Sequence, residues 1–244
     1  ARPYADHLSE VIISLLPDVD RSLLSLLDVR EVKREALVLV TSDRGLAGAF
    51  NANIIRRAEE EILEAGQENV DLICIGRKGR DHFRGRGYEI IRDFTDFWSE
   101  LSFKNAMDFG GEIISHFTGR EVDRVRVLYN WFRNVATQEI RVEDLLPLTY
   151  EENSVKAVDR LYEPSKEEIV YSLIPRHLNV QMWKYLLESF ASEQAARMVA
   201  MDNATENAQE MIKNLTLDFN KARQAAITKE MLEIVGGAEA LATN

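Results

Sequence analysis

The last part of the chain, from Arg176 to Asn244, constrains the fold more than any other feature. These 69 residues contain no proline and only two glycines, Gly236 and Gly237, and they are rich in Ala, Leu, Met, Glu, Gln and Lys, which favour the α-helix. At about 1.5 Å per residue, a single helix of this length would extend ~100 Å. A compact domain built from the other residues would measure only ~40 Å across. The sequence therefore predicts a long helix that protrudes from its domain.

An apolar stripe runs along this predicted helix. After Met201, apolar side chains recur from position 208 onward at alternating spacings of four and three residues, which is typical of a seam between two helices. They are Ala208, Ile212, Leu215, Phe219, Ala222 and Ala226. The stripe predicts a partner helix, and the polar residues elsewhere predict contact with water or with a polar bearing. Packing of a bent helix inside a bundle of its own domain is the alternative interpretation.

Composition limits the classes of protein to which the chain can belong. Its 244 residues are enough for a large core, and no apolar run approaches the ~20 residues that span a bilayer, so we expect no direct membrane insertion. Thirty basic and 41 acidic residues give a net charge of -11, which makes nucleic acid an unfavourable partner. The single cysteine, Cys74, cannot form an internal disulfide and suggests a reducing, cytoplasmic compartment.

The middle of the chain alternates strand and helix patterns, which predicts an α/β fold. A short helix at the front, with an apolar face formed by Tyr4, Leu8, Val11 and Leu15, precedes this region. The predicted strands and helices are a strand at 36–40, a helix at 51–65 closed by Gly66, strands at 70–75 and 88–94, a helix at 103–117, and a strand through Val125, Val127 and Tyr129 that turns near 134–137 and returns through Ile140 and Val142. The first strand is apolar without alternation, as expected for a strand buried on both faces.

The sequence lacks the motifs that usually carry nucleotide, metal or nucleophilic chemistry. Gly45 and Gly48 follow the first predicted strand, but their spacing matches neither dinucleotide nor P-loop motifs. An anion could still bind at the N-terminus of the next helix, and we keep this as a lower-ranked reading. The four histidines are dispersed without metal-ligand spacing. Ser42 and Asp43 have no positioned base, so we predict no metal, no cofactor and no catalytic residue.

One stretch of the chain is strongly basic. It contains Arg77, Lys78, Arg80, Arg84 and Arg86, with aromatic residues inside and beside it. Such a stretch could bind RNA or anionic lipid. We favour the other interpretation, a solvated helix and loop whose arginines pair with the acidic residues of the same chain.

Four segments together resemble one known family. They are SDRGLAGAFNANI at 42–54, GRKGRDHFRGRGYEI at 76–90, ASEQAARMVAMDNATENA at 191–208 and NKARQAAITKEMLEIVGGAEAL at 220–241, and they are similar to the gamma subunit of F-type ATP synthase. The resemblance runs from about Ala1 to the C-terminus. It implies a Rossmann-like central α/β domain flanked by terminal helices that form an antiparallel coiled coil.

This resemblance also implies a division of the chain into three parts. Residues 1–28 would be the end of the N-terminal helix and a linker, residues 29–165 the central α/β domain, and residues 166–244 the long coiled-coil helix. Most of the family's N-terminal helix would precede Ala1. We therefore expect the chain to be a fragment, and we expect the outer part of its last helix to order with difficulty because the partner of its seam is missing.

The function implied by the resemblance is that of a rotor. A central-stalk subunit of this family couples ion flow through a membrane c ring to ATP synthesis or hydrolysis, and it has no active site of its own. Its partners would be the alpha and beta subunits of the catalytic ring, the epsilon subunit and the c ring, on the cytoplasmic face of a bacterial membrane. From the loop after the first strand, we keep as the alternative a nucleotide- or anion-binding α/β module with a helical oligomerisation tail.

The resemblance assigns partner contacts to particular residues. Arg223, Gln224, Thr228 and Glu230 match the helix segment that contacts a catch loop of the catalytic subunits, through charge-assisted hydrogen bonds. Arg197 matches a position near an acidic lever segment, although a simple intrahelical pair with Glu193 is also expected there. Tyr162 and Glu163, in the LYEP motif, match the foot that meets the c ring and epsilon.

Overall fold

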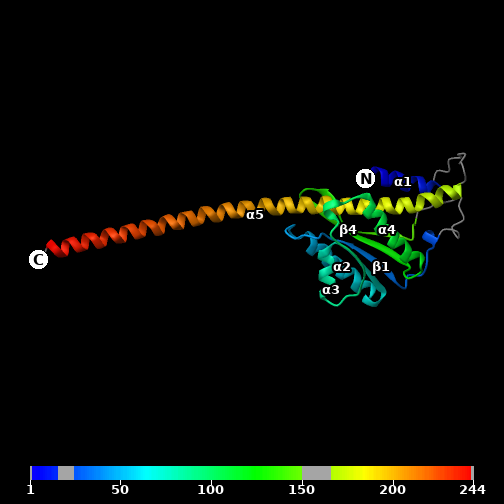
Figure 1. The fold of residues 1–244 in the computed structure, drawn as a ribbon, viewed down its shortest axis with the longest axis horizontal. Helices are drawn as coiled ribbons and strands as arrows, with labels where there is room; N and C mark the ends of the chain where they lie inside the picture. The colour runs from blue at the N-terminus through cyan, green and yellow to red at the C-terminus, as the bar shows by residue number, and fades with distance from the viewer. Residues whose placement is uncertain (1, 16–24, 150–165, 243–244) are drawn as a thin grey trace. The chain divides into compact units, whose positions relative to one another are not determined.

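A computed structural model gives the structure of the chain and describes residues 2–15, 25–149 and 166–242. It divides into two units, Ala1–Val199 and Ala200–Asn244, which are considered in turn. The first unit contains a β-sheet with helices on both of its faces (Figure 1). The domain boundaries predicted from the sequence remain a prediction.

Five strands form the sheet of the first unit in the order β3-β2-β1-β4-β5. Their bounds are β1 Glu35–Val40, β2 Val70–Ile75, β3 Ile90–Phe94, β4 Arg124–Asn134 and β5 Thr137–Leu146, and the connecting helices are α2 Phe50–Ala65, α3 Arg77–Gly85 and α4 Phe103–Thr118. Short 3-10 helices lie at Ser25–Leu27, Gln67–Asn69 and Trp98–Glu100. Neighbouring strands are parallel except for the antiparallel pair of β4 and β5. The predicted α/β class is confirmed, including the turn between positions 134 and 137.

Burial of β1 explains why its sequence does not alternate. Every residue from Ala36 to Val40 has no exposed surface. Val38 and Val40 pack into the larger hydrophobic cluster, with α1 (Arg2–Leu15), α4 and the start of α5. Leu37 and Leu39 pack on the opposite face, with α2 and α3. Because strand side chains alternate between faces, a central strand covered on both sides must be apolar throughout.

Helix α5 spans Lys166–Ala242. It begins at the residue where the resemblance placed the long helix, and ten residues before Arg176, where the proline-free segment begins. The difference arises at Pro175, which lies inside the helix. A proline in a helix interior loses one hydrogen bond and costs about 3 kcal/mol. Burial of Val170, Ile174 and Leu178 around it offsets this cost, because each apolar side chain removed from water contributes about 1.5–3 kcal/mol.

Helix α1 packs along the first part of α5 in the opposite direction. Arg2 bonds to Glu188, and Gln181 Nε2 donates to Ser9 Oγ at 3.2 Å, so the residue numbers rise on one helix as they fall on the other. Ala5, Leu8 and Ile12 are buried on the inner face of α1. The apolar face predicted for the first helix is confirmed at Leu8 and Leu15, but it is wrong at Tyr4, which is 51% exposed. The winding of the two helices as a coiled coil remains a prediction.

The second unit contains the remainder of α5. From Met201 to Ala238, every side chain except that of Asn220 is exposed, including the stripe residues Ile212, Leu215 and Phe219 at 63–66%. The helix nevertheless continues to Ala242, whereas we expected its outer part to order with difficulty. Its alanine, leucine, glutamate and lysine content favours helix without a packing partner. Nowhere in the described residues does a helix contain an 18-residue stretch apolar enough to cross a bilayer.

Burial of His177 on α5 makes the stability of the first unit depend on pH. Burial, with a smaller contribution from the charge of Lys184, lowers the pKa of His177 to about 4. Among the described residues, its Nδ1 has no hydrogen-bond partner. Below the ordinary pKa of about 6.5 the unfolded chain binds a proton that the folded chain cannot bind. Stability is therefore lost as the pH falls from about 6.5 towards 4.

We expect His177→Leu to reduce this loss. Compared with the parent chain, the variant should retain about 2 kcal/mol more of its unfolding free energy between pH 7.5 and pH 5. Urea unfolding at several pH values measures the difference, and His7→Leu serves as the control because His7 is exposed. Parallel curves for the His177 variant and the parent would contradict the assignment.

Candidate partner-binding site

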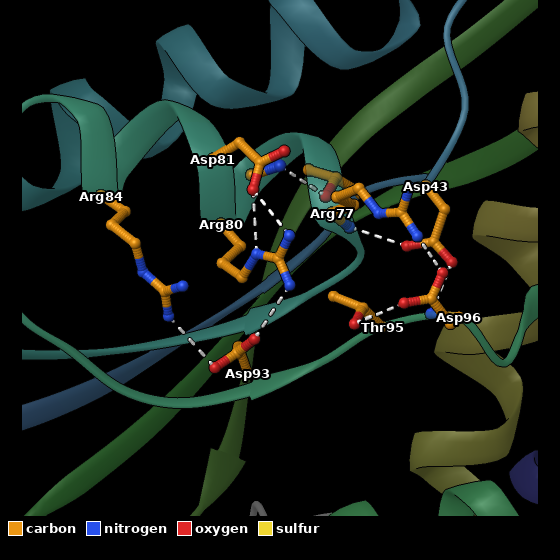
Figure 2. Close-up of polar contacts among 10 residues, drawn as sticks. Asp43, Arg77, Arg80, Asp81, Arg84, Asp93, Thr95 and Asp96 are labelled. Atoms are coloured by element: carbon orange, nitrogen blue, oxygen red, sulfur yellow. Dashed lines mark hydrogen bonds and ion pairs between the residues drawn. The ribbon is translucent and has the colours of Figure 1, made fainter.

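The carboxyl ends of β1, β2 and β3 bring three charged residues together (Figure 2). Asp43 Oδ1 accepts a hydrogen bond from the backbone N–H of Arg77 at 2.8 Å. Its Oδ2 accepts one from the backbone N–H of Asp96 at 2.7 Å. The Arg77 guanidinium in turn pairs with the Asp96 carboxylate. One carboxylate thus fixes the loops after three neighbouring strands relative to each other.

Helix α3 carries the basic stretch, and its arginines are paired within the chain (Figure 2). Arg80 bonds to Asp81 at 2.9 Å, and this bond raises the pKa of Arg80. Both Arg80 and Arg84 also reach Asp93, on β3, at 3.4 Å. The interpretation that these arginines pair with acidic residues of the same chain is confirmed. Their charge is largely balanced locally, which weakens any attraction for RNA.

The glycine-containing loop after β1 is closed by its own side chains. Asn51 Nδ2 donates to Ser42 Oγ at 2.8 Å, and its Oδ1 accepts from Ser42 N at 3.0 Å. Both Leu46 and Gly48 have positive φ, 62° and 56°. Glycine adopts this region without strain, whereas leucine does not. At the start of α3, the Asp43 carboxylate already accepts a hydrogen bond from the first helical N–H. A second anion at the start of α3 would meet that negative charge. The anion-binding alternative concerns a different helix end, the N-terminus of α2, and stays a prediction.

Arg197 lies on α5 beside this loop. Its Nη2 donates to Glu193 Oε1 at 2.6 Å and to the backbone carbonyl of Gly45 at 3.2 Å. The intrahelical pair with Glu193 expected from the sequence is therefore confirmed, while the bond to Gly45 was not predicted. Through it, α5 contacts the loop that follows the central strand.

A groove of about 570 Å³ lies between this loop, the turn after β3 and α5. Its lining residues combine both signs of charge with aromatic rings: Asp43, Arg44, Arg77, Asp96, Trp98, Ser99, Phe190, Glu193, Gln194 and Arg197. The rings of Trp98 and Phe190 are stacked, with centroids 6.1 Å apart and planes at 10°. Most of the charges pair with each other, so the groove presents a rigid polar surface rather than a site of one charge.

The four residues predicted to contact a catch loop are exposed on α5 in the second unit. Arg223 lies one helical turn beyond Phe219, so it borders the apolar stripe, and Glu230 lies on the same side. Gln224 and Thr228 are four residues apart and share the face opposite the stripe. The four side chains therefore form two pairs on different faces.

The remaining predictions concern the foot residues Tyr162 and Glu163, metal binding and the single cysteine. Tyr162 and Glu163 lie outside the described residues. Within the described ranges, no group of three or more His, Cys, Asp or Glu side chains is placed to hold a metal ion. Burial raises the pKa of the Cys74 thiol to about 12, so this cysteine is a poor nucleophile.

Sequence reasoning did not find the carboxylate centre formed by Asp43 and Asp96. The signal for Asp43 was its place directly after a buried strand. The position of Asp96 depends on its positive φ of 65°, in a turn that no sequence pattern predicted. Glu188 was missed as well. It is a buried carboxylate on α5, and its helix-favouring residue type gave no sign of burial.

Comparison with known proteins places these features in a family. A family model described as ATP synthase matches residues 1–241. The ATP synthase gamma chain of Chlorobaculum tepidum is 47% identical over 249 residues, covering 99% of this chain and 85% of its own length. That of Cytophaga hutchinsonii is 49% identical over 251 residues, covering 98% and 85%.

A solved structure of Euglena gracilis mitochondrial ATP synthase, comprising OSCP, F1 and the c-ring, contains a chain with the same fold. The TM-score is 0.67 at 21% identity, over 98% of this chain and 90% of that one. At this identity the likeness concerns the fold, whereas the bacterial gamma chains share nearly half of their residues along almost the whole sequence. The chain belongs to the gamma-chain family of ATP synthase, whose members are non-catalytic rotor subunits.

Proposed function

We propose that the chain is the central rotor of an ATP synthase, coupling ion flow through a c ring to ATP synthesis or hydrolysis in a surrounding ring of alpha and beta subunits. The observation that carries this proposal is the exposed, stripe-bearing part of α5 from Met201 to Ala238 in a member of the gamma-chain family. A helix with this much uncovered apolar surface requires partners.

A rotor acts by offering a different surface to each catalytic site. Each orientation must favour one conformation of the neighbouring site through differential contacts, because a shaft with identical contacts in every orientation would shift no equilibrium. The two pairs on α5 fit this requirement. Arg223 and Glu230 are charged and border the stripe, whereas Gln224 and Thr228 are neutral and lie opposite it. The shaft thus presents chemically different faces to its ring.

The remaining partners follow from the same proposal. Arg197 would meet an acidic lever segment of a catalytic subunit and would keep its pair with Glu193 at other rotor angles. Tyr162 and Glu163 would contact the c ring and the epsilon subunit, an assignment that rests on the sequence alone. The complex would sit on the cytoplasmic face of a bacterial membrane, with this chain peripheral to it.

Assembly with alpha and beta subunits tests the proposal. We expect the full chain to join them in a complex whose ATP hydrolysis depends on its presence. Arg223→Ala should weaken this assembly about 10- to 100-fold, because a hydrogen bond to a charged group contributes about 1.5–3 kcal/mol. Titration of the chain into the ring subunits, followed by ATP hydrolysis, measures the effect.

Arg56→Ala is the matched control, because Arg56 is an exposed arginine of α2 that bonds only to Asn53 Oδ1 among the described residues. This variant should assemble like the parent. A chain that fails to join the ring at any concentration, or that binds nucleotide by itself at micromolar concentration, would refute the rotor proposal and favour an α/β binding module.

A further inference from the structure

The end of β4 extends beyond its parallel neighbour and meets α5 instead. Strand β1 ends at Val40, and its last pairing with β4 joins Leu39 to Leu128. Asn130 and Phe132 therefore lie past the end of β1, on the side of β4 where none of the described strands pairs with them. Their backbone N–H and C=O groups need other partners, because a buried backbone group without one is costly.

Side chains of α5 form hydrogen bonds with the backbone N–H and the backbone carbonyl of Asn130. Its backbone N–H donates to Ser189 Oγ at 3.3 Å, and its carbonyl accepts from Ser192 Oγ at 3.2 Å. Both serines are buried, with at most 1% exposed surface. A helix thus takes the place of a neighbouring strand at this point of the sheet.

Glu188 and Arg2 provide the corresponding bonds for Phe132. Glu188 Oε2 accepts from the backbone N–H of Phe132 at 3.1 Å and from Arg2 Nη2 at 2.5 Å. Arg2 Nη2 also donates to the Phe132 carbonyl at 2.6 Å, and its Nε bonds to the other oxygen of Glu188. The hydrogen bond to Glu188 raises the pKa of Arg2, more than burial lowers it. One carboxylate therefore connects α1, β4 and α5.

This connection is stiff for physical reasons. The Arg2–Glu188 contact uses two nitrogens and two oxygens, a fork geometry that fixes orientation as well as distance. Glu188 is 7% exposed, so water competes weakly for its oxygens. The Arg2 guanidinium also lies 4.8 Å from the centroid of the Trp131 ring, which restricts it further.

We propose that Glu188 is a positioning residue for torque transfer, holding the sheet of the first unit rigidly to helices α1 and α5. The inference rests on the proposed rotor function, because stiffness of this connection matters only in a part that transmits rotation. The role of Glu188 is to prevent the sheet from turning against the helices that run beside it.

Amide hydrogen exchange tests the connection itself. In Glu188→Ala the Phe132 N–H loses its acceptor, and we expect its exchange to accelerate about tenfold or more, the equivalent of about 1.4 kcal/mol. Amides in the middle of β1 should exchange as in the parent. Unchanged exchange at Phe132 would overturn the inference.

Rotation of the assembled complex tests the mechanical role. A Leu63→Cys substitution attaches a bead to the sheet domain, since Leu63 is 72% exposed and Cys74, the only cysteine, is buried. In the Glu188→Gln variant we expect the angular variance of the bead during catalytic pauses to rise about twofold, because a neutral hydrogen bond is roughly half as strong as a charge-assisted one. The rate of ATP hydrolysis should not change.

Glu112→Gln is the control variant, because it neutralises an exposed ion pair with Arg92 in the same unit. Equal bead variance in the Glu188 and Glu112 variants, with faster Phe132 exchange in the former, would mean that Glu188 is structural only and would overturn its mechanical role. If the unaltered chain neither assembles nor rotates, the rotor proposal itself fails. That outcome differs from a failure of the Glu188 inference, in which the unaltered chain still rotates.

Discussion

Replacing Gly76 with alanine is expected to destabilise the first unit by about 4 kcal/mol, the combined order of backbone strain and overpacking. Gly76 has φ of +100°, and an added Cβ would lie 2.6 Å from the carbonyl carbon of Thr41 and even closer to its oxygen. Thr41 cannot move away, because its backbone N–H donates to the Ile75 carbonyl at 2.7 Å and its Oγ1 accepts from Gly79 N at 2.9 Å.

The measurement is urea or thermal unfolding of the variant, and Gly111→Ala is the matched control. Gly111 lies inside α4, and an added Cβ there would meet no atom of the described residues within 4 Å. Alanine at this position should stabilise by about 0.5–1 kcal/mol. Similar stabilities of the two variants would show that the close approach of Gly76 to Thr41 has no energetic consequence.

Removal of the Arg126 charge should lower the free energy of unfolding by about 3 kcal/mol or more, because removing one partner of a buried ion pair leaves the other charge uncompensated. Arg126 bridges Glu35 and Glu61, whose side chains are only 2% and 6% exposed. Burial alone would lower the pKa of Arg126, but hydrogen bonds to the two carboxylates raise it. In Arg126→Met the carboxylates stay buried with less compensation, although Arg124 and Arg57 still contact them.

A triple variant separates the pair from simple packing. Combining Arg126→Met with Glu35→Gln and Glu61→Gln removes the charges together, and we expect most of the lost unfolding free energy to return, since neutral replacements avoid an uncompensated buried charge. Arg92→Met, which breaks an exposed pair, should change stability by less than about 0.5 kcal/mol. If Arg126→Met is equally harmless, the buried network is not needed for stability.

Much of the fold could be predicted because local patterns and tertiary environment agreed. The strand predicted at 70–75 matches β2, and the helix predicted at 103–117 differs from α4 by one residue. Buried strands must be apolar on both faces, and helices between sheet and solvent must be amphipathic, so each pattern had one interpretation. The beginning of α5 could not be predicted from its local pattern, because Pro175 signals a helix end. Packing around Val170 and Ile174 keeps the helix intact there.

The site was less predictable than the fold. The pair of Arg197 with Glu193 depends on helix spacing alone, and it was anticipated. Two other bonds, from Arg197 to the Gly45 carbonyl and from the Phe132 N–H to Glu188, depend on which residues the sheet order brings together. Spacing along the chain carries no information on those neighbours. Partner contacts of particular residues were expected from the family resemblance alone, and they stay predictions.

Periodicity and residue type were thus sufficient for the α/β class, the positions of the strands and the long last helix, because these follow from forces that act between near neighbours and from the need to bury apolar side chains. The partners of Asp43, Arg126 and Glu188 arose from the folded arrangement. Each is a charge bound by groups far away in the sequence, and for Glu188 and Arg126, which are largely buried, these groups offset the cost of burial. Such groups become neighbours when the sheet is formed.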